Sequence, residues 1–178
     1  MLILVMGLAA VFATATYFEE TTGLLPVGTR APEFSAKTSD GLGISLSRYL
    51  GKMNVVLFFY PKDFTVGCTS EACSMRDGYG DLLAEDAVAF GISRDDGRSH
   101  ENFRSRYDLT FDLIPDTNRS IIKHYGVERL GGMIGIPKRV TYVIDKKGII
   151  RLVSHHEFSM GDHFADVIQT LRDINAKR

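Results

Sequence analysis

The stretch NVVLFFYPKDFTVGCTSEACSM, residues 54–75, decides the fold of this chain. After Asn54 it runs through apolar side chains, mostly β-branched and aromatic, and stops at Pro61. Such a run without polar alternation is typical of a strand buried on both faces of a sheet. Helical spacing follows from about Ser70 to Ala84, with an apolar stripe formed by Ala72, Met75, Tyr79, Leu82 and Leu83. The stretch therefore predicts a buried strand, a loop and a helix.

The residues on either side predict further strands and helices. Residues 33–38, followed by a turn at 39–41, indicate a short hairpin, and two β-rich runs around a turn ending in Gly148 indicate a second one. The other expected elements are a buried strand at 88–92, a polar helix at 98–107, a short strand at 113–116, a helix at 119–125, hairpin strands at 140–144 and 149–153, and an amphipathic helix at 162–175. This order predicts an α/β fold with a central mixed sheet and helices on both faces.

Composition limits the classes of function. With 178 residues the chain can form one packed domain with a small appendage. Its net charge of −1 gives no reason to expect a nucleic acid as partner. Two cysteines are too few for a disulfide framework, and a bond between positions as close as Cys68 and Cys73 would stabilise the fold little. The spacing suits two thiols that meet during a reaction.

The first eighteen residues form a separate segment without a charged side chain. As a helix it would be about 27 Å long, near the lower limit for crossing a bilayer. We therefore divide the chain into a hydrophobic segment at 1–20, a linker at 21–27 and a domain at 28–178. Residues 1–18 predict a membrane tether or an export signal. The alternatives are a segment docked on the domain or a start codon assigned too early, either of which would leave the protein cytoplasmic.

Cys68 lies in a position that activates a thiol. In sheets of this kind, ligands gather at the carboxyl ends of strands and at the helix N-termini that follow them. A cysteine in the first helical turn is surrounded by unpaired backbone N–H groups at the positive end of the helix dipole, which favours the thiolate. Thr65 can present its hydroxyl toward the sulfur or an incoming oxygen, and Pro61 restrains the loop that carries both groups.

Cys73 follows Cys68 at an offset of five residues. In an ideal helix this offset separates the two Cα atoms by roughly 8.7 Å, whereas a disulfide requires about 7 Å or less. The two cysteines therefore cannot form a bond while the helix is intact. If they do so during a reaction, the start of the helix must unwind. The alternative is that Cys73 is a small apolar core residue.

The motif Pro61-x-x-x-Thr65-x-x-Cys68 resembles the active site of the peroxiredoxins, the AhpC/TSA superfamily. The longer stretch from Tyr60 to Cys73, YPKDFTVGCTSEAC, is similar to the bacterioferritin comigratory protein (PrxQ) branch, and the likeness extends from about Val27 to the C-terminus. The resemblance implies a thioredoxin-like fold with an added N-terminal β-hairpin. One departure is Val66, which stands where the family usually has proline and leaves the loop freer.

The resemblance also implies a catalytic cycle. Cys68 would be the peroxidatic cysteine, Cys73 the resolving cysteine, and Arg139 an arginine beside the nucleophile. The expected substrates are hydrogen peroxide and organic hydroperoxides, reduced through a Cys68 sulfenic acid and a Cys68–Cys73 disulfide that thioredoxin or another dithiol reopens. Neither a cofactor nor a metal is required. The expected assembly is a monomer or weak dimer.

Two other functions are less compatible with the residues. A membrane-tethered copper chaperone of the thioredoxin fold would use two cysteines and a histidine such as His163, but such proteins have three residues between their cysteines, not four. A general thiol–disulfide oxidoreductase would use Cys-x-x-Cys. Three further expectations concern other residues. His100 and His124 are expected to be surface or partly packed histidines, Glu71 to contact the loop or Arg76 without a catalytic role, and residues 131–135 to form a flexible loop near the site.

Overall fold

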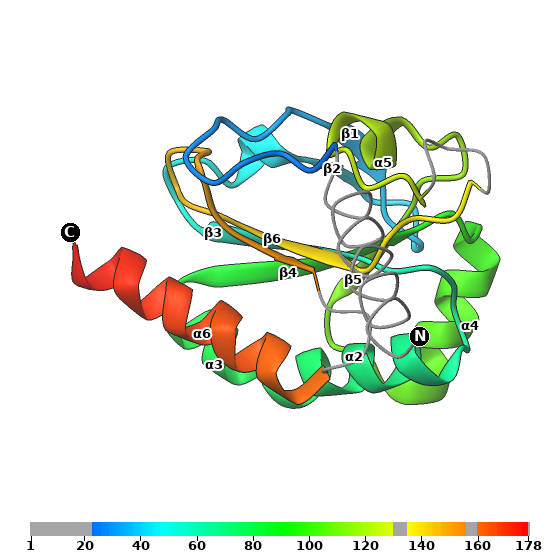
Figure 1. Ribbon diagram of the computed structural model, residues 1–178. Helices are drawn as coiled ribbons and strands as arrows, with labels where there is room; N and C mark the ends of the chain where they lie inside the picture. The colour runs from blue at the N-terminus through cyan, green and yellow to red at the C-terminus, as the bar shows by residue number, and fades with distance from the viewer. Residues whose placement is uncertain (1–22, 130–134, 156–159, 178) are drawn as a thin grey trace, which may run out of the picture.

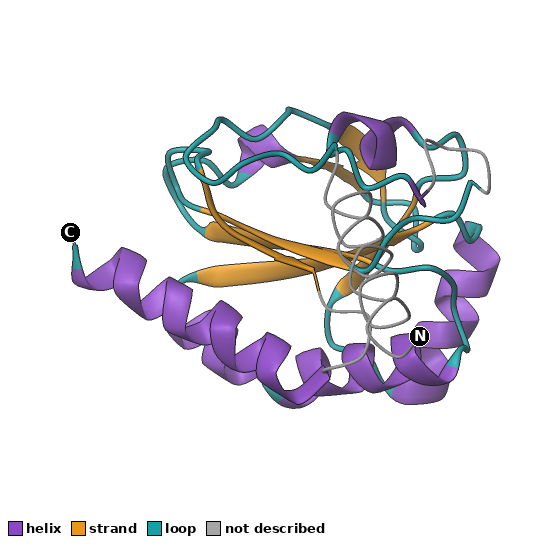
Figure 2. Ribbon diagram, in the orientation of Figure 1, coloured by secondary structure: helices purple, strands orange, loops and turns teal. Residues whose placement is uncertain are grey.

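The computed structural model describes residues 23–129, 135–155 and 160–177 and shows a five-stranded sheet between two layers (Figures 1 and 2). The strands are β3 (Asn54–Phe59), β4 (Ala87–Ser93), β5 (Asp112–Pro115), β6 (Val140–Ile144) and β7 (Ile150–His155). Their order is β5-β4-β3-β6-β7. The strand pairs β3–β4 and β4–β5 are parallel, whereas β3–β6 and β6–β7 are antiparallel. The predicted mixed sheet is confirmed.

The two faces of the sheet are covered differently (Figure 1). One face carries α2 (Val66–Asp77), α3 (Tyr79–Ala84), α4 (Gly97–Tyr107) and α6 (Met160–Ala176). The other carries the antiparallel hairpin of β1 (Ser35–Lys37) and β2 (Gly43–Ser45), the 3-10 turn η1 (Leu46–Arg48) and the short helix α5 (Ser120–His124). Helices on both faces and the N-terminal hairpin were both predicted, and both are confirmed.

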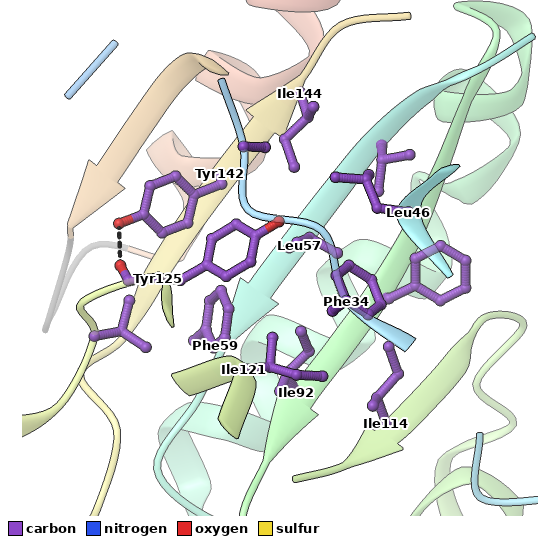
Figure 3. Close-up of a cluster of buried hydrophobic side chains, with 14 of the residues drawn as sticks. Phe34, Leu46, Leu57, Phe59, Ile92, Ile114, Ile121, Tyr125, Tyr142 and Ile144 are labelled. Atoms are coloured by element: carbon purple, nitrogen blue, oxygen red, sulfur yellow. Dashed lines mark hydrogen bonds between the residues drawn. The ribbon is translucent and has the colours of Figure 1, made fainter. Parts of the chain in front are cut away.

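Strand β3 lies at the centre of the sheet and is buried along its whole length. Its side chains alternate between two hydrophobic clusters. Val55, Leu57 and Phe59 face the cluster under the hairpin and α5, which Figure 3 shows around Tyr125 and Tyr142. Val56 and Phe58 face the cluster under α2, α4 and α6. Because both faces are apolar, this strand needs an apolar residue at every position from Val55 on, which explains the unbroken run in the sequence.

The helix predicted at 70–84 is wrong in two respects. It begins earlier, at Val66, and it ends at Asp77, with Gly78 separating α2 from α3. A Cβ atom at Gly78 would lie 2.1 Å from Cζ of Phe164, so α6 approaches too closely for any larger residue. The break changes the phase of the apolar stripe, and Leu83 is consequently 49% exposed. The other predicted elements appear within two residues of their expected bounds.

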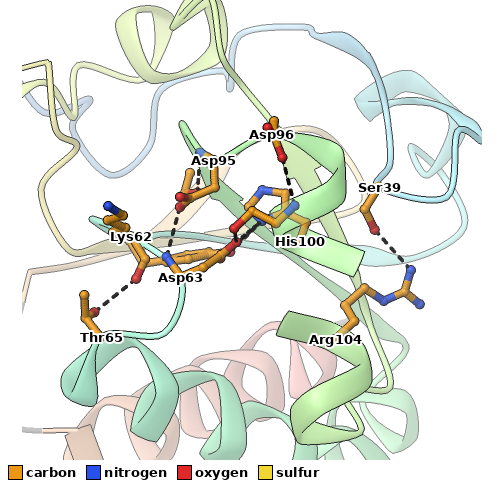
Figure 4. Close-up of polar contacts among 11 residues, drawn as sticks. Ser39, Lys62, Asp63, Thr65, Asp95, Asp96, His100 and Arg104 are labelled. Atoms are coloured by element: carbon orange, nitrogen blue, oxygen red, sulfur yellow. Dashed lines mark hydrogen bonds and ion pairs between the residues drawn. The ribbon is translucent and has the colours of Figure 1, made fainter. Parts of the chain in front are cut away.

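A buried polar network holds the loop between β3 and α2 (Figure 4). Asp63 accepts hydrogen bonds from the hydroxyls of Tyr60 (2.8 Å) and Ser99 (2.7 Å) and contacts Nδ1 of His100 at 2.9 Å. The backbone N–H of Asp63 donates to Oδ2 of Asp95 (2.9 Å). Burial is the main cause that raises the pKa of Tyr60 well above its usual value, and the charge of Asp63 is the second. The Tyr60 hydroxyl therefore stays protonated and remains a donor. The loop is thereby fastened to α4.

His100 is therefore not the surface or partly packed histidine that the sequence predicts, because its side chain is fully buried. Its partner Asp63 lies 37 residues away in the sequence, and a polar helix offers no local sign of such a contact. His124, in contrast, is exposed as expected.

The predicted tether at residues 1–18 and residues 131–134 of the expected loop lie outside the described residues. Among the helices of the described part of the chain, none has the length and apolar character needed to cross a membrane.

The network predicts that Asp63→Ala lowers the free energy of unfolding by about 1–3 kcal/mol, because Tyr60 and His100 are left buried without their acceptor. Denaturant-induced unfolding measures the loss. Asp173→Ala is the matched control: Asp173 is exposed and receives a hydrogen bond from Gln169 (2.9 Å), a contact worth about 0.2–0.5 kcal/mol. Equal losses in the two variants would contradict the anchoring role of Asp63.

Candidate active site

Cys68 occupies the first turn of α2, as predicted, and its side chain is 1% exposed. Thr65 is the N-cap of this helix, in an extended conformation with φ −80° and ψ 148°. Cys68 is thus the third helical residue, among the N–H groups that have no partner within a helix. The sulfur faces the apolar cluster beneath α2, where water is excluded. A thiolate in such a place needs a positive partner.

Arg139 supplies that partner. It directly precedes β6 and is 6% exposed, and its Nη2 donates to the sulfur of Cys68 at 3.2 Å. Burial opposes the charged guanidinium, but the negative charges of Glu71 and Cys68 outweigh it and raise the pKa of Arg139. The guanidinium therefore stays charged beside the sulfur. The expected contact between Cys68 and Arg139 is present across 71 residues of sequence.

Glu71 has a role that the sequence analysis missed. It is 3% exposed, and its Oε2 accepts a hydrogen bond from Nη1 of Arg139. From the sequence, we expected the loop or Arg76 as the partner of Glu71 and did not foresee Arg139. Arg76 itself pairs with Asp77 (2.7 Å). Residues three apart lie on the same side of a helix, so the spacing from Cys68 to Glu71 was the available signal. Glu71 orients Arg139 and leaves Nη2 for the sulfur.

Thr65 and Pro61 lie in the loop before α2. The hydroxyl of Thr65 is exposed and donates to the carbonyl oxygen of Lys62 at 3.0 Å (Figure 4). With its proton engaged in this way, the hydroxyl oxygen can still accept a hydrogen bond. Pro61 is half-buried at the start of the loop. The functions of these two residues remain predictions.

Cys73 lies five residues after Cys68 in the same uninterrupted helix, and both thiols are free. The helical geometry from which we inferred their separation is therefore present. Cys73 is half-buried, between the extremes of a core residue and an exposed one. Its part in the chemistry remains a prediction.

His163 is one of the histidines that a copper site could have used. It is 3% exposed and contacts hydroxyls through both ring nitrogens, Ser154 through Nδ1 (3.1 Å) and Thr141 through Nε2 (2.5 Å). Within the described residues, no three His, Cys, Asp or Glu side chains are grouped so that they could hold a metal. The copper-binding alternative is not supported.

Comparisons with known proteins identify the family of this chain. The AhpC/TSA family model matches residues 27–153. Chloroplastic peroxiredoxin Q of Oryza sativa subsp. japonica is 36% identical over 153 residues, 85% of this chain and 69% of that protein. Peroxiredoxin Bcp of Bacillus subtilis is 36% identical over 158 residues, 86% of this chain and 99% of that protein.

A solved structure gives the same answer for the fold. The crystal structure of peroxidoxin BcpB from Mycobacterium tuberculosis superimposes with a TM-score of 0.78 at 35% identity, covering 84% of this chain and 98% of that one. The thioredoxin-like fold expected from the sequence is thereby confirmed. The chain belongs to the AhpC/TSA family, in its peroxiredoxin Q/Bcp branch.

Proposed function

We propose that this chain is a thiol-dependent peroxidase in which Cys68 attacks the peroxide. The observation that carries the proposal is the 3.2 Å contact from Nη2 of Arg139 to the buried sulfur of Cys68. A fixed cation and the N–H groups of the first turn of α2 both stabilise negative charge at that sulfur. Membership of a peroxidase family supports the same chemistry.

In the first step the Cys68 thiolate attacks the terminal oxygen of a hydroperoxide. A sulfur–oxygen bond forms, the oxygen–oxygen bond breaks, and the leaving alkoxide or hydroxide takes up a proton to give an alcohol or water. The sulfur is oxidised to a sulfenic acid and the peroxide is reduced by two electrons. Arg139 stabilises the charge that moves onto the leaving oxygen, and Thr65 orients the peroxide.

In the second step Cys73 attacks the sulfenic sulfur. A Cys68–Cys73 disulfide forms and the sulfenic oxygen leaves as water. Because the two residues lie five positions apart in α2, the start of this helix must unwind before the sulfurs can meet. A dithiol of the thioredoxin type then reduces the disulfide by exchange. We expect a monomer or weak dimer, since one chain carries both cysteines.

The scheme predicts two products after one equivalent of hydrogen peroxide. The wild-type protein should lose two hydrogens as the disulfide forms, whereas Cys73→Ser should gain one oxygen at Cys68. Cys68→Ser should take up no oxygen at position 68 and lose the peroxidase activity. Intact-protein and peptide mass spectrometry distinguish these outcomes. Peroxide reduction by Cys68→Ser at the wild-type rate would refute the scheme.

The residue at position 66 should control how easily the start of α2 unwinds. It is the first residue of the helix and 90% exposed, a position that favours proline. Val66→Pro should stabilise the start of the helix by about 0.4–1 kcal/mol, which slows unwinding by roughly two- to fivefold. The sulfenic acid then persists longer, and more Cys68 should reach sulfinic acid at high peroxide.

Mass spectrometry of Cys68 after turnover at high peroxide measures the sulfinic fraction. Val66→Ala is the control, because it shortens the side chain and keeps the backbone N–H and a freer φ. If the proline and alanine variants become overoxidised to the same extent, the start of α2 does not limit formation of the disulfide.

The N-terminal segment carries a separate proposal, that residues 1–18 tether the peroxidase domain to a membrane. Its support is the length and apolar character of the uncharged run. In fractionated cells the full chain should sediment with membranes and resist extraction by salt and carbonate, whereas a chain starting at residue 21 should not. If both chains stay in the supernatant, the tether does not exist.

A further inference from the structure

The side chain of His163 points from α6 into the space between α2 and the sheet. It contacts Thr141 of β6 and Ser154 of β7 through hydrogen bonds, and its Nε2 lies 3.6 Å from Oε1 of Glu71 in α2. Four elements therefore meet at one buried imidazole. The peroxidase scheme above does not use this group.

We propose that His163 is a positioning residue for the reaction of Cys68, acting through Glu71 on Arg139. The proposal rests on the proposed function and deepens it. The contacts form one line, from the imidazole to Oε1 of Glu71, from Oε2 to Nη1 of Arg139, and from Nη2 to the sulfur. Each member is buried, so solvent screens the interactions little.

The direction in which His163 acts follows from charge. Glu71 holds Arg139 in place, but its carboxylate also opposes a negative charge on Cys68. Nε2 is hydrogen-bonded to Thr141 and lies 3.6 Å from Oε1, so the ring edge acts on the carboxylate as a nearby dipole that draws negative charge away from Arg139 and limits rotation of the carboxylate. Both effects leave more of the positive charge of Arg139 for the sulfur. Loss of this group should therefore lower the thiolate fraction of Cys68.

The position of the ring is set by its hydroxyl partners. Thr141 lies two residues after Arg139, so the two side chains leave the chain on the same side. Ser154 fixes the opposite ring nitrogen at 3.1 Å. With both nitrogens engaged, the imidazole cannot turn away from Glu71 without breaking a buried hydrogen bond.

The contact with Glu71 also concerns the second step of the cycle. Glu71 lies between Cys68 and Cys73, in the part of α2 that must unwind before the disulfide can form. The His163–Glu71 contact has to break in that motion. His163 therefore supports attack on the peroxide and opposes resolution. A role in stability alone would not affect the two steps in opposite directions.

The test compares two amide variants of similar polarity. In His163→Gln the amide reaches the place of Nε2, whereas in His163→Asn it reaches only that of Nδ1, beside Ser154. We expect the pH profile of iodoacetamide alkylation of Cys68 to move to higher pH in the asparagine variant. The rate of sulfenic acid formation should fall by about two- to fivefold, the effect of one weakened electrostatic contact between buried groups.

The glutamine variant should keep most of the wild-type rate of sulfenic acid formation. The asparagine variant should form the disulfide from the sulfenic acid faster than the wild type does. Denaturant-induced unfolding measures the stability of each protein. His124→Leu, which removes an exposed histidine, is the control and should leave both steps unchanged. The proposal would be overturned if His163→Asn showed the wild-type pH profile of Cys68 alkylation and the wild-type rate of sulfenic acid formation.

A double-mutant cycle tests the route through Glu71. If His163 acts through that carboxylate, His163→Asn should change the alkylation profile little once Glu71→Gln is present. Full additivity of the two changes would refute the route. Alkylation does not require peroxide turnover, so these results stand apart from the proposed function. If the wild-type protein failed to reduce hydroperoxide, the proposed peroxidase function would be refuted, but the effect of His163 on the reactivity of Cys68 would not.

Discussion

The contact between Arg139 and the buried sulfur of Cys68 is the interaction on which the active site depends. Burying a charged group costs a large free energy unless a partner of opposite sign compensates it. In the proposed peroxidase, the Cys68 thiolate, the guanidinium and the carboxylate of Glu71 compensate one another in a row. Removing any one of them would leave a buried charge without its neighbour. The site is therefore a single electrostatic unit rather than a nucleophile with separate helpers.

This unit is assembled by the packing of the sheet. Cys68 and Glu71 lie one turn apart on α2, which follows the central strand β3. Arg139 precedes β6, the antiparallel neighbour of β3. Because β3 pairs with β6, the start of α2 comes close to a residue 71 positions later in the chain. The Asp63–His100 network then fastens the intervening loop to α4, which holds the start of the helix against the sheet.

The same helix carries two opposing requirements. Intact, α2 presents N–H groups to Cys68 and holds Glu71 against Arg139. Unwound, as the proposed cycle requires, it would let Cys73 reach the sulfur. The sequence is compatible with both states, since Val66 at the first helical position is exposed and lacks the rigidity of proline. Phe164 packs against Gly78, where α2 ends, so the segment that would unwind in the proposed cycle is short.

The amino-acid sequence by itself determined the order of strands and helices, the mixed sheet and the place of Cys68, because hydrophobic periodicity and the motif around this cysteine are local signals. Arg139 followed from the family resemblance alone. Tertiary structure decided what depends on distant residues: the end of α2 at Gly78, the burial of His100 by Asp63, the pairing of Glu71 with Arg139, and the approach of His163 to Glu71. Local patterns do not reveal these contacts, because the energy of a buried polar group depends on partners that only folding brings near.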